Sequence, residues 1–294
     1  MSTRPPESVI HDLGYRGYDG PRLGLPGMAR ALFVTGLRHA WGLGRSGRSR
    51  VLPFLLLGAA MVPAAVMVGI MAMVPQFDIP VNYAGYPGNV QVLIAVYAAA
   101  QAPVLFSRDL QFGSIVLYLA RPLGSALFAT VRWLSLTTAI AMFTLAPVLV
   151  LYLGALLTDH DVADQSAAFG KAVLAILLLS AMLATITGIV SSLSTRRGLP
   201  VVISIALLIV GSGVVAIAQE LAIARDGADI AAYVGLASPF TVYSGIAHLL
   251  DNTVGIAPGD LSTGLGVLYV LVALGLPALG LLFLMRRFAK VGSR

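Results

Sequence analysis

Six long apolar runs constrain the fold of this chain more than any other feature of its sequence. They cover residues 52–74, 90–106, 127–153, 172–194, 200–218 and 264–285. A helix rises about 1.5 Å per residue, so about 20 apolar residues cross the roughly 30 Å of bilayer hydrocarbon. The two shorter runs reach this length if they extend a little into the membrane interface. The sequence therefore predicts an all-α membrane protein with six transmembrane helices.

The composition favours the same fold class. Of the 294 residues, 58% are hydrophobic and only 11% are charged, whereas about a quarter are charged in ordinary globular chains. Cysteine is absent, which excludes disulfides, thiolate metal sites and cysteine nucleophiles. The net charge is +6, but the arginines lie beside apolar runs and not in a polar basic domain. We therefore expect them to contact membrane lipids and not nucleic acid.

The basic residues are distributed unevenly around the predicted spans. Of the 19 Lys and Arg residues, 17 lie in the N-terminal region, the second and fourth connections and the C-terminal tail, counting Arg132. Only Lys171 and Arg225 lie on the other side. Because cytoplasmic loops carry the excess of basic residues, both termini are predicted to be cytoplasmic. An even number of spans agrees with this orientation.

Residues 1–50 are predicted to be a cytoplasmic tail followed by an interfacial helix, and residues 286–294 a second cytoplasmic tail. About 50 mostly polar residues precede the first long apolar run, so no removable signal peptide is expected. From residue 28 to about 49, Phe33 and Leu37 share one helical stripe with Trp41, as in a helix that lies in the membrane interface. The glycines of 42–47 are expected to end this helix.

Several basic and aromatic residues are predicted to anchor the chain at the membrane interface. Such positions favour Trp and Arg, because an indole or guanidinium can meet lipid headgroups while its apolar part stays in hydrocarbon. The predicted anchors are Arg38, Trp41, Arg45, Arg48 and Trp133.

The connection before the last span, residues 219–263, is too long for a simple turn. It contains two apolar stretches, 230–236 and 240–250, interrupted by Ser238 and Pro239. We expect short helices that rest on the outer surface or re-enter the membrane without crossing it. Acidic residues gather on the same predicted side, but in no spacing known for metal ligands, so no metal site is expected.

No motif for catalysis or nucleotide binding is present in the sequence. The phosphate-loop pattern Gly-x-x-x-x-Gly-Lys-Ser/Thr is absent. Residues 42–47 match a dinucleotide fingerprint by their letters, but they follow a predicted helix where that motif requires a strand. None of the four histidines lies in a predicted span. We therefore expect no catalytic residue in this chain and no cofactor bound by it.

The connection between the second and third spans is the most informative segment. An apolar run is bounded by Arg108 and Asp109 at one end and by Arg121 and Pro122 at the other. This pattern predicts a short helix at the cytoplasmic membrane surface that presents polar ends to a partner; a plain interfacial loop is the simpler alternative. Arg132, within the third apolar run, could pair with Asp109 or extend its guanidinium to the membrane surface. The neighbouring tryptophan favours the second arrangement.

These residues resemble those of the permease subunits of type-2 ATP-binding-cassette (ABC) transporters, which export drugs, polyketide antibiotics and polysaccharides. The resemblance covers most of the chain through its six spans, interfacial helix and long outer connection, and residues 10–22 are similar to a tail seen in actinobacterial members. The positions that carry it in the link are Arg108, Asp109, Gly113, Arg121 and Pro122, with the leucines between them.

The resemblance implies a function and a set of partners. Residues 108–122 would form a coupling helix that contacts a separate cytoplasmic ABC ATPase, which binds ATP and Mg. A second permease copy, identical or different, would complete an outward pathway for a lipophilic or amphipathic substrate across a bacterial plasma membrane. An ion-coupled secondary transporter and a non-transporting membrane scaffold are the alternatives. Ion coupling usually needs a carboxylate near mid-membrane or paired repeats, and the sequence has neither.

Overall fold

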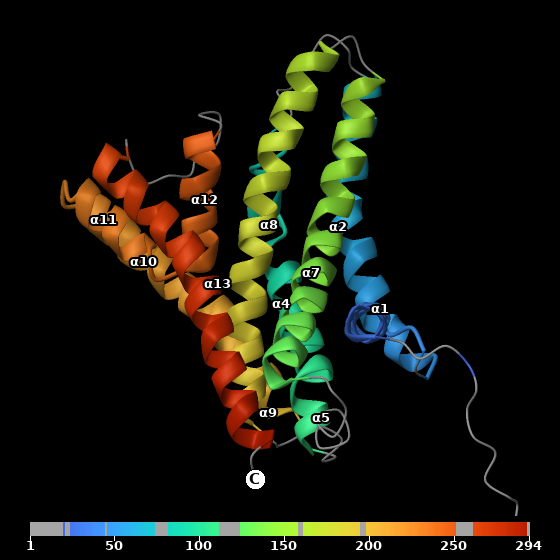
Figure 1. Ribbon diagram of the computed structural model, residues 1–294. Helices are drawn as coiled ribbons and strands as arrows, with labels where there is room; N and C mark the ends of the chain where they lie inside the picture. The colour runs from blue at the N-terminus through green and yellow to red at the C-terminus, as the bar shows by residue number, and fades with distance from the viewer. Residues whose placement is uncertain are drawn as a thin grey trace, which may run out of the picture.

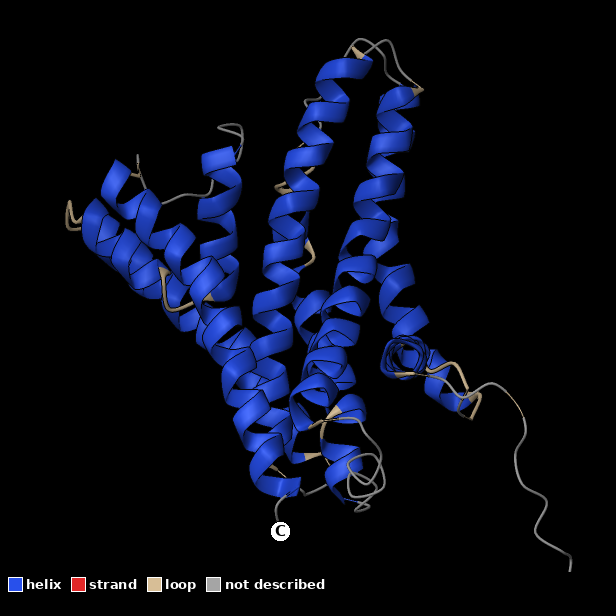
Figure 2. Cartoon of the chain, viewed as in Figure 1, coloured by secondary structure: helices blue, strands red, loops and turns tan. Residues whose placement is uncertain are grey.

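The computed structural model of the chain describes residues 20, 24–44, 46–73, 82–111, 124–157, 161–194, 198–250 and 261–292. Every regular element within these residues is a helix (Figure 2). In chain order the helices are α1 (Leu25–Ala40), α2 (Arg48–Met73), α3 (Tyr86–Asn89), α4 (Gln91–Leu105), α5 (Ser107–Gln111), α7 (Ser125–Leu156), α8 (Val162–Leu193), α9 (Leu199–Ile205), the π-helical segment η1 (Ala206–Val210), α10 (Gly211–Ile223), α11 (Ala228–Gly235), α12 (Pro239–Leu250) and α13 (Thr263–Gly292).

Five helices are long and apolar enough to cross a membrane. They are α2, α7, α8, the continuous α9–η1–α10 and α13. Helices α7 and α8 have 32 residues each, which makes them about 48 Å long against about 30 Å of hydrocarbon. They form the tall central hairpin of Figure 1, with α2 beside α7 and α13 beside α8. The predicted all-α, membrane-embedded character is thus confirmed at the level of five candidate spans.

The second predicted span corresponds to α4, which has only 15 residues and is about 22 Å long. It is therefore not among the five helices of spanning length. Helix α4 lies among α7, α8, α9 and α1, and its residues Ile94, Ala95, Tyr97 and Ala98 are fully buried. The short helix α3 precedes α4 in the chain, and the short helix α5 follows it. Among the described residues, the bent pair formed by α11 and α12 is the further candidate for a crossing by length and composition.

The helix that contains the fourth predicted span is longer than that span. Residues 172–194 were expected, but α8 already begins at Val162. Asp161 caps the helix, because its Oδ1 accepts a hydrogen bond from the backbone N–H of Ala163 at 2.8 Å. Asp164 lies in the first turn, where the helix dipole favours a negative charge. These polar residues lengthen the helix beyond its apolar run, and hydropathy alone gives no sign of them.

Two short helices do occupy the long connection before the last span. Helices α11 and α12 are bent by 115° relative to each other. The break precedes Pro239, and proline disfavours helical geometry at the residue before it. Helix α11 packs on α10, whereas α12 packs on α8 and α13. Both lie at the end of the molecule opposite α9 and the C terminus (Figure 1).

Helix α1 crosses the long helices and is seen nearly end-on in Figure 1. It packs mainly on α7, with Leu32, Gly36 and Ala40 buried. Ser135 of α7 donates a hydrogen bond from its Oγ to the carbonyl oxygen of Phe33 at 3.2 Å. The helix ends at Ala40, followed by Gly42 and Gly44 with φ of 68° and 79°. The predicted helix end at these glycines is confirmed, since such φ values favour glycine.

Candidate functional site

The link between α4 and α7 is described only at its beginning and its end. Its first turn forms α5, residues Ser107–Gln111, and the chain is described again from residue 124. Three of the predicted coupling residues, Gly113, Arg121 and Pro122, lie outside the described residues. Of the predicted coupling residues, the structure describes Arg108 and Asp109.

Asp109 of α5 forms an ion pair with Arg132 of α7. The distance between Asp109 Oδ2 and Arg132 Nη2 is 2.6 Å, and the side chains are 13% and 3% exposed. The guanidinium carbon of Arg132 also lies 5.4 Å from the ring centroid of Phe128. The expectation that Arg132 extends to the membrane surface is wrong, and the alternative pairing is correct. A buried guanidinium without a counter-charge is costly, and the Asp109 carboxylate supplies that counter-charge.

Helix α1 reaches the same arginine through Gly36. A Cβ atom added at Gly36 would lie 3.6 Å from Arg132 Nη1 and 2.7 Å from Ser135 Oγ. Any larger side chain at this position would therefore push α1 away from α7. We call Gly36, Asp109, Phe128, Arg132 and Ser135 the Arg132 junction. It is the place where α1, α5 and α7 meet.

The start of the link is also fixed to α8 and α13. Ser107 is buried, and its Oγ donates a hydrogen bond to the carbonyl oxygen of Ser191 at 2.5 Å. The neighbouring Phe106 packs against Phe288 of α13, with ring centroids 6.1 Å apart. Phe288 in turn lies edge-on to Phe128, at 5.4 Å. A displacement of α5 would therefore be transmitted directly to three long helices.

The predicted interface anchors fall into different environments. Arg38 and Arg48 are exposed, and so is the predicted coupling residue Arg108; Arg45 lies outside the described residues. Trp41, by contrast, is only 9% exposed. Its ring lies 5.7 Å from that of Phe54 and 5.5 Å from that of Tyr97. Trp41 is therefore a core residue, because aromatic packing between helices has replaced the predicted contact with lipid headgroups.

Trp133, the other predicted aromatic anchor, joins two long helices. Its indole N–H donates a hydrogen bond to Thr185 Oγ1 of α8 at 2.8 Å. The side chain is partly buried, so it retains some contact with the surroundings. Sequence reasoning missed this bond, and it also missed Gly36 and Ser107. The only sequence signal for them is a small residue within a predicted helix or beside an apolar run.

Within the described ranges, no group of three or more His, Asp or Glu side chains is close enough to hold a metal ion. Around Arg132, the short helix α5 is bonded to two long apolar helices, α7 and α8.

Comparisons with known proteins do not identify a family. No protein-family model matches the chain, and no curated protein matches it at a significant level.

Proposed function

We propose that this chain is the membrane permease subunit of a type-2 ABC exporter in a bacterial plasma membrane. The observation that carries the proposal is the attachment of α5 to the long helices by the Asp109–Arg132 ion pair and the Ser107–Ser191 hydrogen bond. A permease driven by a separate ATPase needs a link that a cytoplasmic partner can contact and that moves together with the spans. A link segment bonded to both α7 and α8 at its start meets the second requirement.

The proposed topology has six crossings. Five are the helices of spanning length, and the sixth is α4 extended by α3. In this topology α11 and α12 enter the membrane from the side on which α10 ends, and they return to that same side. Their 115° bend and their position opposite α9 support this arrangement (Figure 1). An even number of crossings places both termini on one side.

The charge distribution supports a cytoplasmic location for that side. The exposed Arg48 and Arg50 begin α2, Arg108 lies in α5, and Arg286 and Arg287 lie near the end of α13. All these positions belong to the side on which 17 of the 19 basic residues are expected. Under the positive-inside rule, α5 then faces the compartment that contains ATP.

A second permease copy completes the proposed transporter. Helices α2 and α9–η1–α10 leave most of their apolar surface exposed, whereas α7 and α8 are largely enclosed. These two exposed spans offer surface for a closed two-fold pair with the pathway between the copies. The walls of such a pathway would be largely apolar, which suits a lipophilic or amphipathic substrate. ATP and Mg would be bound by the ATPase, one copy for each permease.

Copurification tests this proposal directly. The tagged chain, expressed in its native host and extracted in mild detergent, is expected to retain a stoichiometric ATPase whose turnover is measurable. The charge reversal Arg121→Glu should lower both the retained ATPase and its turnover. Arg225→Glu is the matched control, since Arg225 is an exposed arginine on the opposite predicted side, and it should change neither. An ATPase-free preparation would favour an ion-driven transporter or a scaffold.

A further inference from the structure

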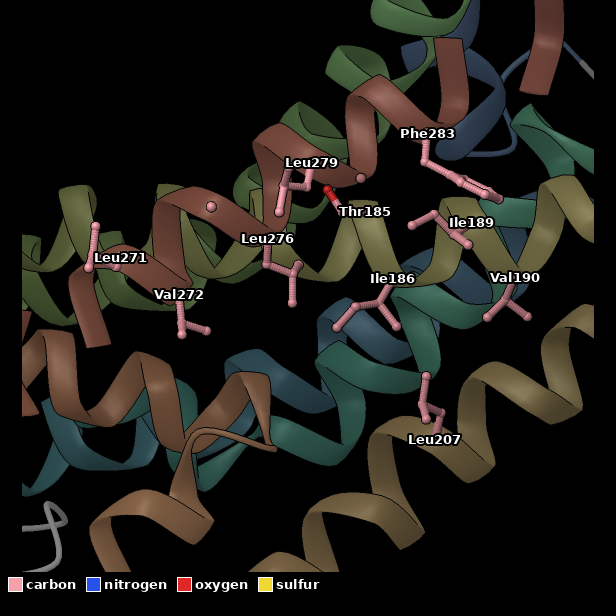
Figure 3. A pocket seen from close by; sticks show the side chains of 12 residues that line it. Thr185, Ile186, Ile189, Val190, Leu207, Leu271, Val272, Leu276, Leu279 and Phe283 are labelled. Carbon is pink, nitrogen blue, oxygen red and sulfur yellow. The ribbon is translucent and has the colours of Figure 1, made fainter. Parts of the chain in front are cut away.

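An apolar groove runs along α13 between α8 and η1 (Figure 3). Its volume is about 730 Å³. Helix α8 contributes Ile186 and Ile189 to one wall, and η1 contributes Leu207 on the opposite side. Helix α8 also supplies Thr185 and Val190, and α13 supplies the remaining residues, including Leu276, Leu279 and Phe283. The groove therefore lies between three of the helices that are long enough to cross a membrane.

The groove offers apolar contact only. Thr185 supplies the one side-chain hydroxyl of its lining. That hydroxyl donates to the carbonyl oxygen of Ala181 at 2.8 Å and accepts from the indole N–H of Trp133 at 2.8 Å. A polar ligand would lose its hydrogen bonds to water here without replacing them. The chemistry of the lining thus selects an aliphatic chain.

The dimensions suit one acyl chain within one half of a bilayer. From Leu271 to Phe283 the groove follows α13 for about 18 Å, close to the roughly 15 Å that make up half of the hydrocarbon thickness. Leu207 and Leu279 remain 50% and 70% exposed. No atom lies within 4 Å of a Cβ added at Gly275, so this glycine leaves the groove open. On a membrane-crossing surface, hydrocarbon chains would cover such positions.

Basic residues continue the groove at one end. Arg286 and Arg287 follow Phe283 by one helical turn and therefore lie on the same face of α13. Arg286 is exposed and Arg287 is half-buried. The Nε of Arg287 is buried and makes no hydrogen bond to any residue that the structure describes. Guanidinium groups at the end of an apolar groove complement a phosphate above an acyl chain.

We propose that this groove binds an anionic phospholipid, with one acyl chain along α13 and the phosphate at Arg286 and Arg287. The site lies beside the permease pathway proposed above and requires only that the chain is embedded in a membrane. It does not depend on ATP-driven transport. A second permease copy is the competing occupant, and the experiment distinguishes the two.

Trp133 is a built-in reporter for this site. The chain contains two tryptophans, so the variant Trp41→Phe leaves only Trp133, which is bonded to the groove residue Thr185. The variant is placed in vesicles that contain phosphatidylglycerol or phosphatidylcholine with brominated acyl chains, because bromine quenches tryptophan fluorescence on close approach. Brominated phosphatidylglycerol should quench the fluorescence of Trp133 at a lower mole fraction than brominated phosphatidylcholine does. The ratio of the two mole fractions should be about fivefold for each arginine that binds the phosphate.

Two further substitutions in the Trp41→Phe background test the two ends of the site. Gly275→Phe fills the groove and should remove the selective quenching; Leu279→Phe, at a highly exposed position, is a second filling variant. Gly58→Phe is the matched control, because Gly58 is an exposed, open glycine of α2. Arg286→Gln combined with Arg287→Gln should make the two lipids equivalent. The pair Arg48→Gln and Arg50→Gln, at exposed positions of α2, should preserve the preference.

Either of two results would overturn the proposal. The first is that both lipids quench Trp133 equally and that Gly275→Phe and Leu279→Phe do not change this quenching. The second is the absence of quenching by either lipid, together with disulfide formation between two copies that carry Leu207→Cys in this cysteine-free chain. That result would assign the groove to an interface between permeases. Comparison of the elution profiles of all variants shows that each remains folded.

Discussion

Removing the carboxylate of Asp109 should destabilise the chain more than removing the guanidinium of its partner, Arg132. Arg132 is only 3% exposed, so Asp109→Ala leaves a positive charge that water can hardly reach. Loss of one partner from a buried pair costs about 3–5 kcal/mol, and we expect a value near the lower end because Asp109 is 13% exposed. Arg132→Met keeps the apolar stem and leaves a carboxylate that is closer to solvent. We expect it to cost about 1–2 kcal/mol.

The double variant Asp109→Ala/Arg132→Met decides whether the pair acts as a unit. With both charges removed, neither is left uncompensated, so the loss should be no larger than that of Arg132→Met alone. The sum of the stability losses of the two single variants would then exceed the loss of the double variant by about 3 kcal/mol. Thermal unfolding of the purified chain in one detergent is a suitable assay. The midpoint for Asp109→Ala is expected to fall by roughly 6 °C or more.

The matched control for this cycle is Arg225→Gln, which alters an exposed charge between α10 and α11. A surface change of this kind should alter stability by about 0.5 kcal/mol or less. Strictly additive effects of Asp109→Ala and Arg132→Met would refute the reasoning, since they would show that the two side chains do not interact. Equal effects of Arg225→Gln and Asp109→Ala would also refute it, because loss of the buried pair would then cost no more than a surface change.

Three further predictions concern contacts between helices. Gly36→Leu should separate α1 from α7, because its side chain would collide with Ser135; a cysteine introduced at Phe33 should then react faster with a maleimide than in the parent. Thr185→Val removes the acceptor of the Trp133 indole and should cost about 1 kcal/mol, with a blue shift of Trp133 fluorescence in the Trp41→Phe background. Tyr83 donates to Gln165 at 2.6 Å, and burial raises its pKa from 10.0 to about 12. The stabilisation from Tyr83 should therefore be complete below pH 10 and be lost as the pH rises through 12, which thermal unfolding of the parent and of Tyr83→Phe across this pH range would detect.

The long helices could be predicted because apolar length is a local property of the sequence. Five of the six predicted apolar runs became helices of spanning length, although their ends moved when a polar cap such as Asp161 extended them. The run at 90–106 became the short α4, which is enclosed by other helices. Its enclosure depends on how the other helices pack, and that information is not contained in a hydropathy profile.

The candidate site could be predicted only in part, because its contacts join distant segments. In the sequence, Asp109 stands at the polar start of the link and Arg132 is a basic residue within an apolar run. An ion pair between them was one of the two predicted arrangements. It did not reveal that Gly36 and Ser107 would bring α1 and α8 to the same place. Trp41 illustrates the opposite error, since a residue typical of membrane interfaces was used for packing between helices.

The length of the α7–α8 hairpin has a mechanical consequence. A tilt of 40°, near the upper limit for membrane helices, would reduce its height from about 48 to about 37 Å, still more than the hydrocarbon thickness. At any tilt up to about 40°, the hairpin therefore extends beyond the hydrocarbon into the headgroup region. A hairpin of this length acts as a lever: rotated as a unit by about 5° about one end, it moves its other end by about 4 Å. Because Asp109 holds α5 near one end of this lever, a small push on the link would become a displacement on the far side of the membrane.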